Sequence, residues 1–314
     1  MLIIGFILLI VGADLLVKGS SNIAKKFHIP EMLIGLTIVA LGTSMPELII
    51  TITSASHNSS DLIMGNAIGS NLCNLLLILG LVAVLRPVKI DQETKRIHVP
   101  VSLLSTVAIL GMGVGTWGSQ KGVISRTDGI ILVLLYFLYF LYPIVVGIKD
   151  ISNSIKENKE KHIKTKSALL SIVYIILGII LLRYGGDLVV NEATEIAIKY
   201  GISERVIGLT IVAIGTALPE LITSIIATIK KEENLAMGNL IGSCILNILL
   251  ILGTGAIIIP LSFSIDFMHN LILLAITTIL IWAFCFIGRK NTISRFEGLV
   301  LLVLFAGYMV SLFR

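Results

Sequence analysis

The sequence predicts an all-α membrane protein with ten transmembrane helices, arranged as two inverted-topology repeats of five helices each. Three observations predict this fold. First, 56% of the 314 residues are hydrophobic and only 14% are charged, whereas a soluble domain carries about 25% charged residues. Second, ten apolar stretches reach the roughly 20 residues that a helix needs to cross a bilayer. Third, two motif-bearing segments of the first half recur in the second half.

Short polar connections separate the ten predicted spans, except for one long lysine-rich interval after the fifth. This interval, 149–166, divides the chain into a first five-helix repeat (1–148) and a second, inverted repeat (167–314). The first span lacks the basic start and small-residue cleavage site of a signal peptide, so we expect it to remain as a helix. The predicted limits of the spans are 1–17, 30–56, 62–85, 99–118, 127–148, 167–190, 206–229, 235–259, 267–288 and 296–313.

The lysine and arginine residues predict the orientation of the chain. Most of the 24 Lys and Arg fall in loops on the same side as the interval 149–166. By the positive-inside rule, this interval is a cytoplasmic linker and both termini lie outside the cell membrane, which the protein crosses many times. The net charge of +5 therefore gives no reason to expect a nucleic-acid partner. The three cysteines form no C-x-x-C pair and are predicted to be small core residues.

Two pairs of segments establish the internal repeat. Residues 35–47 read G-L-T-I-V-A-L-G-T-S-M-P-E, and residues 208–220 read G-L-T-I-V-A-I-G-T-A-L-P-E. G-N-A-I-G-S, which begins at Gly65, returns as G-N-L-I-G-S from Gly238. Because each repeat has an odd number of helices, the second must insert with the opposite orientation. Inverted repeats are typical of secondary transporters, whose binding sites lie near the midplane where the repeats meet.

Each repeated motif ends in a glutamate deep within a predicted span, Glu47 in the second and Glu220 in the seventh. A carboxylate at such a depth costs at least a few kcal/mol, and no Lys or Arg lies at matching depth in the four motif-bearing helices. The alternative to an ion-binding role is a structural carboxylate, either protonated or hydrogen-bonded within the bundle.

A proline precedes each glutamate and predicts a break in both helices. Proline removes one N–H and clashes with the carbonyl four residues back, so Pro46 and Pro219 are expected to disrupt residues 40–43 and 213–216. Bare carbonyl groups are tolerated in lipid only where they line a cavity or bind something. A hinge without a ligand is the other interpretation.

The third and eighth spans each carry a polar stripe on an otherwise apolar helix. The stripes repeat the same spacing and consist of Asn66, Ser70 and Asn74, and of Asn239, Ser243 and Asn247. Together with the glutamates they form a set of carboxylate, carbonyl, hydroxyl and amide oxygens, which suits hard cations such as Ca²⁺ or Na⁺. One Ca²⁺ balances two carboxylates, and several Na⁺ could compete for the same oxygens, as ion exchange requires.

At these motifs the chain resembles the cation/calcium exchanger superfamily, and most closely its prokaryotic sodium/calcium exchangers. The resemblance covers essentially all ten helices. It implies an ion-binding core of broken helices 2, 3, 7 and 8, with four cation sites between them. It also implies that helices 1 and 6 slide as a unit past this core, exchanging about three Na⁺ for one Ca²⁺ by alternating access.

The resemblance further implies a role for individual residues. Glu47 and Glu220 would bridge the central Ca²⁺, together with the backbone carbonyls of Thr43 and Thr216. The inner sodium site would consist of the Ala40 carbonyl, Thr43, Glu47 and Ser70. The outer sodium site would consist of the Ala213 carbonyl, Thr216, Glu220 and Ser243, with Ser44 assisting. Asn74 and Asn247 would face the middle position.

Two residues depart from the pattern of the family. Ala217 stands where the motif usually has serine, which removes a hydroxyl from the inner sodium site and bears on sodium affinity or stoichiometry. Asn247 stands where several relatives, including potassium-dependent ones, carry aspartate, which argues against potassium coupling.

Sodium/calcium antiport, in the direction of calcium extrusion, is the leading functional hypothesis, and calcium/proton exchange on the same fold is the alternative. A calcium channel fits the inverted repeat less well. An enzyme is not expected, because no histidine or lysine lies deep enough to act as a base for Ser44 or Ser70 and no H-E-x-x-H motif is present. We expect no cofactor, and we expect the protein to function as a monomer with the two ions and the bilayer as its partners.

Overall fold

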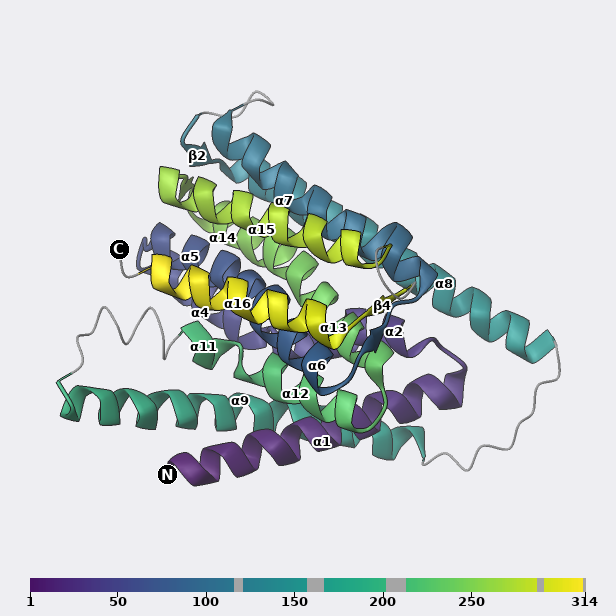
Figure 1. The fold of residues 1–314 in the computed structure, drawn as a ribbon. Coiled ribbons are helices and arrows are strands. Elements are labelled where there is room, and N and C mark those ends of the chain that lie inside the picture. Colours follow the sequence, from purple (N-terminus) through teal and green to yellow (C-terminus); the bar gives the residue numbers. More distant parts are fainter. Residues whose placement is uncertain (116–120, 157–166, 202–212, 287–290, 313–314) are drawn as a thin grey trace. The chain divides into compact units, whose positions relative to one another are not determined.

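A computed structural model describes residues 1–115, 121–156, 167–201, 213–286 and 291–312, with the backbone alone at 147–156 and at Ala213. These residues are almost entirely helical (Figure 1). The elements of the first half are α1 (Leu2–Phe27), α2 (Glu31–Ile34), η1 (Gly35–Val39), α3 (Ala40–Thr43), α4 (Met45–Ser56), α5 (Ser60–Leu72), η2 (Cys73–Ile78), α6 (Leu79–Leu85), β1 (Val88–Lys89), η3 (Thr94–His98), α7 (Val99–Val114), β2 (Val123–Ile124) and α8 (Arg126–Lys156). Those of the second half are α9 (Ala168–Lys199), α11 (Ala213–Thr216), α12 (Leu218–Ile229), α13 (Glu233–Leu246), η5 (Asn247–Leu252), α14 (Gly253–Ile258), β3 (Leu261–Ser262), α15 (Ile265–Phe284), β4 (Thr292–Ile293) and α16 (Arg295–Ser311). The η elements are π-helices.

The described helices confirm an all-helical membrane protein. Seven of them are long and apolar enough to cross a bilayer, or eight if the bent pair Glu31–Thr43 and Met45–Ser56 counts as one span. Of the other two predicted spans, 206–229 is described only from Ala213, and the last corresponds to the 17-residue helix α16. Helix α8 continues to Lys156, into the predicted linker, whose remaining residues lie outside the described part of the chain.

Two compact units contain the described elements. Unit 1 consists of Met1–Thr43 and Tyr139–Gly242, and unit 2 of Ser44–Leu138 and Ser243–Arg314. Each unit therefore takes segments from both halves of the sequence, so the compact units differ from the two sequence repeats.

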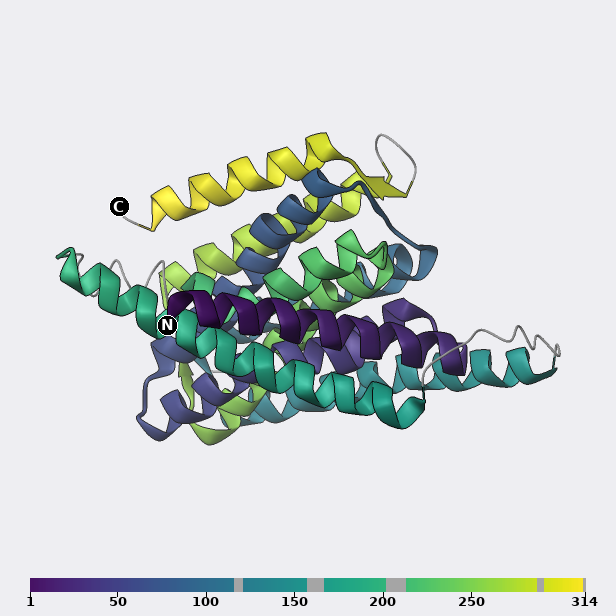
Figure 2. The ribbon, with the colours of Figure 1, turned by 90° about the horizontal axis from the view of Figure 1, so that it is seen from below.

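In unit 1, helices α1 and α9 lie side by side along much of their length (Figures 1 and 2). Glycines allow this close approach: a Cβ added to Gly12 would lie 2.9 Å from the carbonyl oxygen of Gly178, and one added to Gly5 would lie 3.1 Å from that of Gly185. The earlier glycine of α1 faces the later glycine of α9, and the later one faces the earlier, so the two helices run antiparallel. Small residues at such a contact are typical of membrane helix pairs.

A second glycine contact in unit 1 joins η1 to α13. A Cβ on Gly35 would lie 2.6 Å from the carbonyl oxygen of Leu235, and one on Gly238 would collide with the carbonyl oxygen of Met32. The G-x-x-x-G motif that begins at Gly238 therefore packs one backbone against another, as its sequence predicts.

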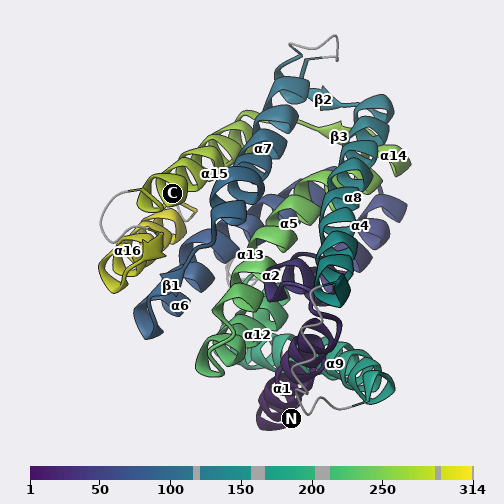
Figure 3. The same cartoon turned by 90° about the vertical axis from the view of Figure 1, so that its right-hand side faces the viewer.

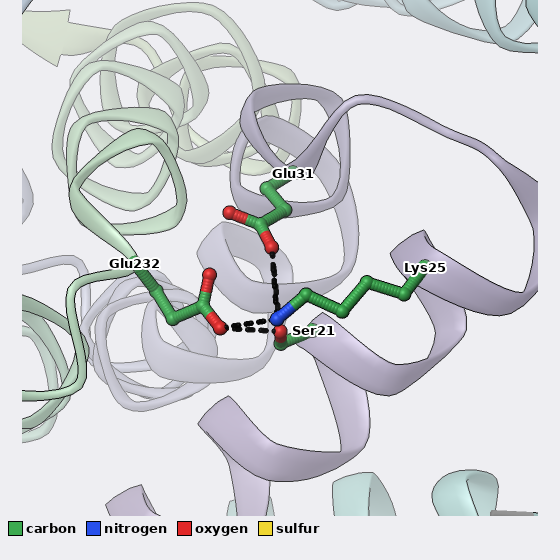
Figure 4. Close-up of polar contacts among 4 residues, drawn as sticks. All are labelled: Ser21, Lys25, Glu31 and Glu232. Carbon is green, nitrogen blue, oxygen red and sulfur yellow. Dashed lines mark hydrogen bonds and ion pairs between the residues drawn. The ribbon is translucent and has the colours of Figure 1, made fainter. Parts of the chain in front are cut away.

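A polar cluster at the end of α1 ties three segments of unit 1 together (Figure 4). The ammonium group of Lys25 lies 2.6 Å from a carboxylate oxygen of Glu232 and 3.5 Å from one of Glu31. The hydroxyl of Ser21 also donates to Glu232, at 2.7 Å. The cluster thus connects α1 with the start of α2 and with the turn that precedes α13.

In unit 2, the contacts between the two halves of the chain come in matching pairs. Strand β1 pairs with β4, and β2 pairs with β3, both antiparallel. A Cβ on Gly80 would lie 3.1 Å from the carbonyl oxygen of Gly298, and one on Gly253 would lie 3.1 Å from that of Gly129. Helix α7 lies beside α15, and α6 beside α16 (Figures 1 and 3).

Candidate functional site

The helical stretches that carry Pro46 and Pro219 each break just ahead of the proline, with one residue between the break and the proline. Helix α3 ends at Thr43 and α4 begins at Met45, so Ser44 is the break. Helix α11 ends at Thr216 and α12 begins at Leu218, which leaves Ala217 at the matching position. The predicted breaks in the second and seventh spans are therefore confirmed, one residue beyond the predicted stretches.

The expectation that the third and eighth helices are broken is wrong. The stretches 60–85 and 233–258 each run as one continuous helical span, and each contains a π-helical segment, η2 or η5. Neither stretch contains a proline, so nothing removes an N–H or forces a clash. The helix widens instead of breaking, because each π-helical hydrogen bond spans one residue more than an α-helical one, a feature that is frequent at functional sites.

The break places each glutamate in the first turn of a helix. Glu47 lies in the first turn of α4 in unit 2, and Glu220 in the first turn of α12 in unit 1. Each side chain is only 1% exposed. Unsatisfied N–H groups and the helix dipole favour negative charge at this position, so the local backbone stabilises an ionised carboxylate that lipid would disfavour.

In unit 1, Thr43 belongs to a chain of hydrogen bonds. Its hydroxyl donates to the Oδ1 atom of Asn239 at 2.9 Å, and the Nδ2 group of Asn239 lies 3.3 Å from the hydroxyl of Ser224. Thr43 and Asn239 are fully buried, as is Ala40, whose carbonyl is a predicted ligand. Because Thr43 donates its one hydroxyl hydrogen in this chain, the lone pairs of its oxygen remain available as a cation ligand.

In unit 2, four predicted ligands form two pairs whose polar atoms lie close together. The hydroxyl of Ser70 lies 3.4 Å from a carboxylate oxygen of Glu47, and the hydroxyls of Ser44 and Ser243 lie 2.9 Å apart. The amide of Asn66 is also 3.4 Å from the backbone carbonyl oxygen of Glu47. Unit 2 therefore brings together a carboxylate, three hydroxyls and an amide.

The two repeated asparagines stand at matching places in the π-helical segments. Asn74 is the second residue of η2 and Asn247 the first of η5. Both are 1% exposed, and the Oδ1 atom of each has no hydrogen-bond partner among the described residues. A buried acceptor without a partner costs about 1–3 kcal/mol, and a cation that coordinates the oxygen removes that cost.

The structure places the predicted ligands in two sets, one in each unit. Unit 1 holds Ala40, Thr43, Ala213, Thr216 and Glu220, of which Ala213 is described by its backbone alone. Unit 2 holds Ser44, Glu47, Ser70, Asn74, Ser243 and Asn247. Their joint role as ligands of one ion cluster stays a prediction.

Sequence reasoning missed two buried polar residues next to these sets, Ser224 and Asn71. Ser224 is fully buried and is the partner of Asn239, whereas Asn71 is 1% exposed and hydrogen-bonds Asn247 at 3.0 Å. Asn71 does not recur, because the second half has Cys244 at the equivalent position, whereas Ser224 has the hydroxyl residue Thr51 as its counterpart. Asn71 and Ser224 are both uncharged polar residues inside an apolar span, which is the sequence feature that indicates them.

The donors in both sets are oxygen atoms. Among the described residues, no group of three or more His, Cys, Asp or Glu side chains could hold a metal ion, and most of the predicted ligands are neutral hydroxyl, amide and carbonyl oxygens. Such ligands suit Ca²⁺ and Na⁺, which take oxygen donors, and do not suit thiolate- or imidazole-bound metals.

Comparison with known proteins identifies a family for this chain. The family model described as "Sodium/calcium exchanger protein" matches residues 1–145 and 170–314. The chain is 30% identical to the sodium/calcium exchanger MaX1 of Methanosarcina acetivorans over 345 residues, covering 99% of this chain and 97% of the relative. It is 35% identical to the inner membrane protein YrbG of Escherichia coli strain K12 over 293 residues, covering 90% and 88%. A solved structure of the sodium-calcium exchanger NCX_Mj, soaked with 10 mM Na⁺ and no Ca²⁺, superposes with a TM-score of 0.84 at 32% identity, covering 99% of this chain and 97% of that one.

Proposed function

The chain belongs to the sodium/calcium exchanger protein family and is a sodium/calcium antiporter, and we propose that the two sets of buried oxygens described above are the ligands of its ions. In this proposal Glu47 and Glu220 supply the charged ligands for Ca²⁺. The hydroxyl, amide and carbonyl groups of Ala40, Thr43, Ser44, Ser70, Asn74, Ala213, Thr216, Ser243 and Asn247 supply the neutral ones.

One observation carries the proposal: a glutamate that is 1% exposed opens a helix immediately after a break, and it does so in both halves of the chain. Burying a carboxylate is expensive unless a charge or a set of hydrogen bonds compensates it. The two carboxylates carry a charge of −2, which one Ca²⁺ neutralises. Several Na⁺ can neutralise the same charge, so the two ions compete for the same oxygens and antiport follows.

We also propose that the chain has ten transmembrane helices in two inverted repeats, 1–148 and 167–314, joined by the basic linker 149–166. The matching contacts support this architecture. The pair Gly5 with Gly185 corresponds to the pair Gly178 with Gly12, and the pairing of β1 with β4 corresponds to that of β3 with β2. Antiparallel contact between equivalent helices, α1 and α9, is what an inverted repeat produces.

The distribution of basic residues supports a location in the cell membrane with both termini outside and the linker in the cytoplasm. Helices α1 and α9 contact each other more extensively than either contacts any other described element. This contact supports movement of the two helices as one body during alternating access. We further propose that the protein extrudes calcium and exchanges about three Na⁺ for each Ca²⁺. It would do so as a monomer, without a cofactor and without enzymatic activity.

Uptake of labelled Ca²⁺ into proteoliposomes tests this function. Vesicles loaded with Na⁺ and diluted into Na⁺-free buffer are expected to accumulate Ca²⁺, while vesicles with a pH gradient alone are not. Uptake that follows the pH gradient and ignores sodium would favour calcium/proton exchange. Uptake that needs no counter-ion gradient would favour a channel.

A further inference from the structure

Asn71 is a buried polar residue that the proposed set of ligands leaves without a role. It lies in α5, directly after the predicted ligand Ser70, and is 1% exposed. Its Nδ2 group donates to the backbone carbonyl oxygen of Cys244 at 3.0 Å. Its Oδ1 atom accepts from the Nδ2 group of Asn247, also at 3.0 Å. All three residues belong to unit 2.

These two hydrogen bonds determine the orientation of both amides. A backbone carbonyl can only accept, so the end of Asn71 that faces Cys244 must be the NH₂ group. The opposite end of Asn71 is then its oxygen, which needs a donor. Asn247 must therefore present its NH₂ group to Asn71. If either amide turned over, two acceptors or two donors would face each other at a buried position, which is costly.

The orientation of Asn247 has a consequence for the ions. Its NH₂ group is held against Asn71, so its Oδ1 atom, on the other side of the planar amide, points away from Asn71. That oxygen is buried and has no hydrogen-bond partner among the described residues. In the reversed orientation the NH₂ group would take its place and would repel a cation.

We propose that Asn71 is a positioning residue, which holds the amide of Asn247 with its oxygen available to the transported cation and its NH₂ group turned away. This inference rests on the proposed role of Asn247 as a ligand. It assigns to Asn71 a function in Ca²⁺ affinity without direct contact with the ion.

The repeat makes this assignment specific to one half of the chain. Asn74 is the counterpart of Asn247, but the counterpart of Asn71 is Cys244, whose thiol is a much weaker acceptor than an amide oxygen. Asn71 and Asn247 therefore form a matched pair in which each amide orients the other. An ionised aspartate at position 247 would place an acceptor against the Oδ1 atom of Asn71 and break the match.

A double-mutant cycle in proteoliposomes tests the proposal. In Asn71→Ala the amide of Asn247 is free to turn over, so the KM for Ca²⁺ is expected to rise about fivefold, the effect of one hydrogen bond, with little change in kcat. In an Asn247→Ala background the same change is expected to leave the KM for Ca²⁺ within about twofold, because Asn71 has lost the group through which it acts. Equal effects in the two backgrounds would overturn the proposal.

A matched control and a second variant complete the experiment. Cys244→Ala leaves the backbone carbonyl that accepts from Asn71 in place. Its KM for Ca²⁺ is therefore expected to stay within about twofold of that of the unchanged protein, because neither hydrogen bond of Asn71 is removed.

Asn71→Leu fills the space of the amide and replaces Asn71→Ala in the double-mutant cycle if the alanine variant does not insert. If both Asn71 variants fail to insert while Asn247→Ala inserts, Asn71 holds the fold and the proposal is wrong. Sodium-driven uptake by the unchanged protein, measured first, separates a failure of this inference from a failure of the proposed function.

Discussion

Glu47 and Glu220 are the residues on which the proposed chemistry depends most. Each is 1% exposed and lies in the first turn of a helix that starts after a break. The helix N-terminus favours an ionised carboxylate, and a bound cation supplies the rest of the compensation that burial demands. Neutralising either side chain should therefore remove ion binding while leaving the helices in place.

We expect Glu47→Gln and Glu220→Gln each to reduce sodium-driven Ca²⁺ uptake at least about 100-fold, because the charge of the ligands sets the affinity for Ca²⁺. Glutamine keeps the size of the side chain, so the yield of inserted protein should not change. Asp61→Asn is the control, since Asp61 is an exposed acid in the first turn of α5, and it should transport normally. Near-normal uptake by either glutamine variant would remove that residue from the site.

At the residue level, the repeat of motifs in both halves identified the main buried polar residues, but not every one of them. The repeated motifs identified Glu47, Glu220, Asn74 and Asn247, all of which are buried. The repeat does not indicate Asn71, because its counterpart is Cys244. The orientation of an amide depends on its three-dimensional neighbours, so no sequence pattern could have indicated which end of Asn247 is available.

At the scale of elements, two prolines mark the breaks in the second and seventh spans, whereas Pro143 lies inside the unbroken helix α8. Pro46 and Pro219 occupy the first turn of α4 and α12, where the missing N–H costs nothing, and this position predicts a helix start. The polar third and eighth helices contain no proline and stay continuous. Their π-helical segments could not be predicted, because polar composition alone does not reveal a wider helical turn.

The contact between η1 and α13 in unit 1 depends on the absence of side chains at its glycines. In Gly238→Ala the added Cβ would collide with the carbonyl oxygen of Met32, and we expect a loss of about 1–3 kcal/mol in stability from overpacking. Gly307→Ala is the control, because no described atom outside the neighbouring residues and backbone of its own helix lies within 4 Å of that Cβ. Its stability should stay within about 1 kcal/mol of the unchanged protein. Thermal unfolding of the purified proteins in detergent compares them, and equal melting temperatures would contradict the tight contact.

The polar cluster of Figure 4 should make the stability of unit 1 depend on pH. Burial raises the pKa of Glu232, but hydrogen bonds with Glu31, Lys25 and Ser21 outweigh burial, so the pKa of Glu232 lies below its ordinary value of 4.5. A carboxylate whose pKa is lower in the folded state stabilises it above the unfolded-state pKa, and this stabilisation disappears as the pH falls through the folded-state pKa.

We therefore expect Lys25→Met to lower the stability by up to about 1 kcal/mol at pH 7, the size of a partly exposed ion pair. The difference from the unchanged protein should shrink as the pH falls below 4.5. Lys26→Met is the control, because Lys26 is exposed on the same turn of α1. Melting temperatures measured from pH 7 to pH 3.5 check both statements. A constant difference over this range would show that Lys25 does not stabilise unit 1 through Glu232.

At the scale of the whole molecule, composition and span length predicted the class of the protein correctly. Length and hydropathy are sufficient for this because an apolar segment of about 20 residues crosses the bilayer as a helix, which satisfies its backbone groups within the segment. The composition of the compact units could not be predicted in the same way. Each unit draws segments from both repeats, since contacts between equivalent helices join distant parts of the sequence.

The proposed orientation is testable with a membrane-impermeant maleimide, since Cys73, Cys244 and Cys285 are all buried. A cysteine at Ser119 is expected to react in intact cells, and one at Lys161 only after the membrane is permeabilised, as the positive-inside rule requires. The reverse pattern would invert the proposed topology.

The most direct test of the account is a crystal structure of the protein soaked with Ca²⁺ and compared with one soaked with Na⁺ alone. We expect an anomalous Ca²⁺ peak within about 2.3–2.6 Å of carboxylate oxygens from both Glu47 and Glu220, and its loss when Na⁺ replaces Ca²⁺. A Ca²⁺ ion bound elsewhere, with neither glutamate among its ligands, would contradict it.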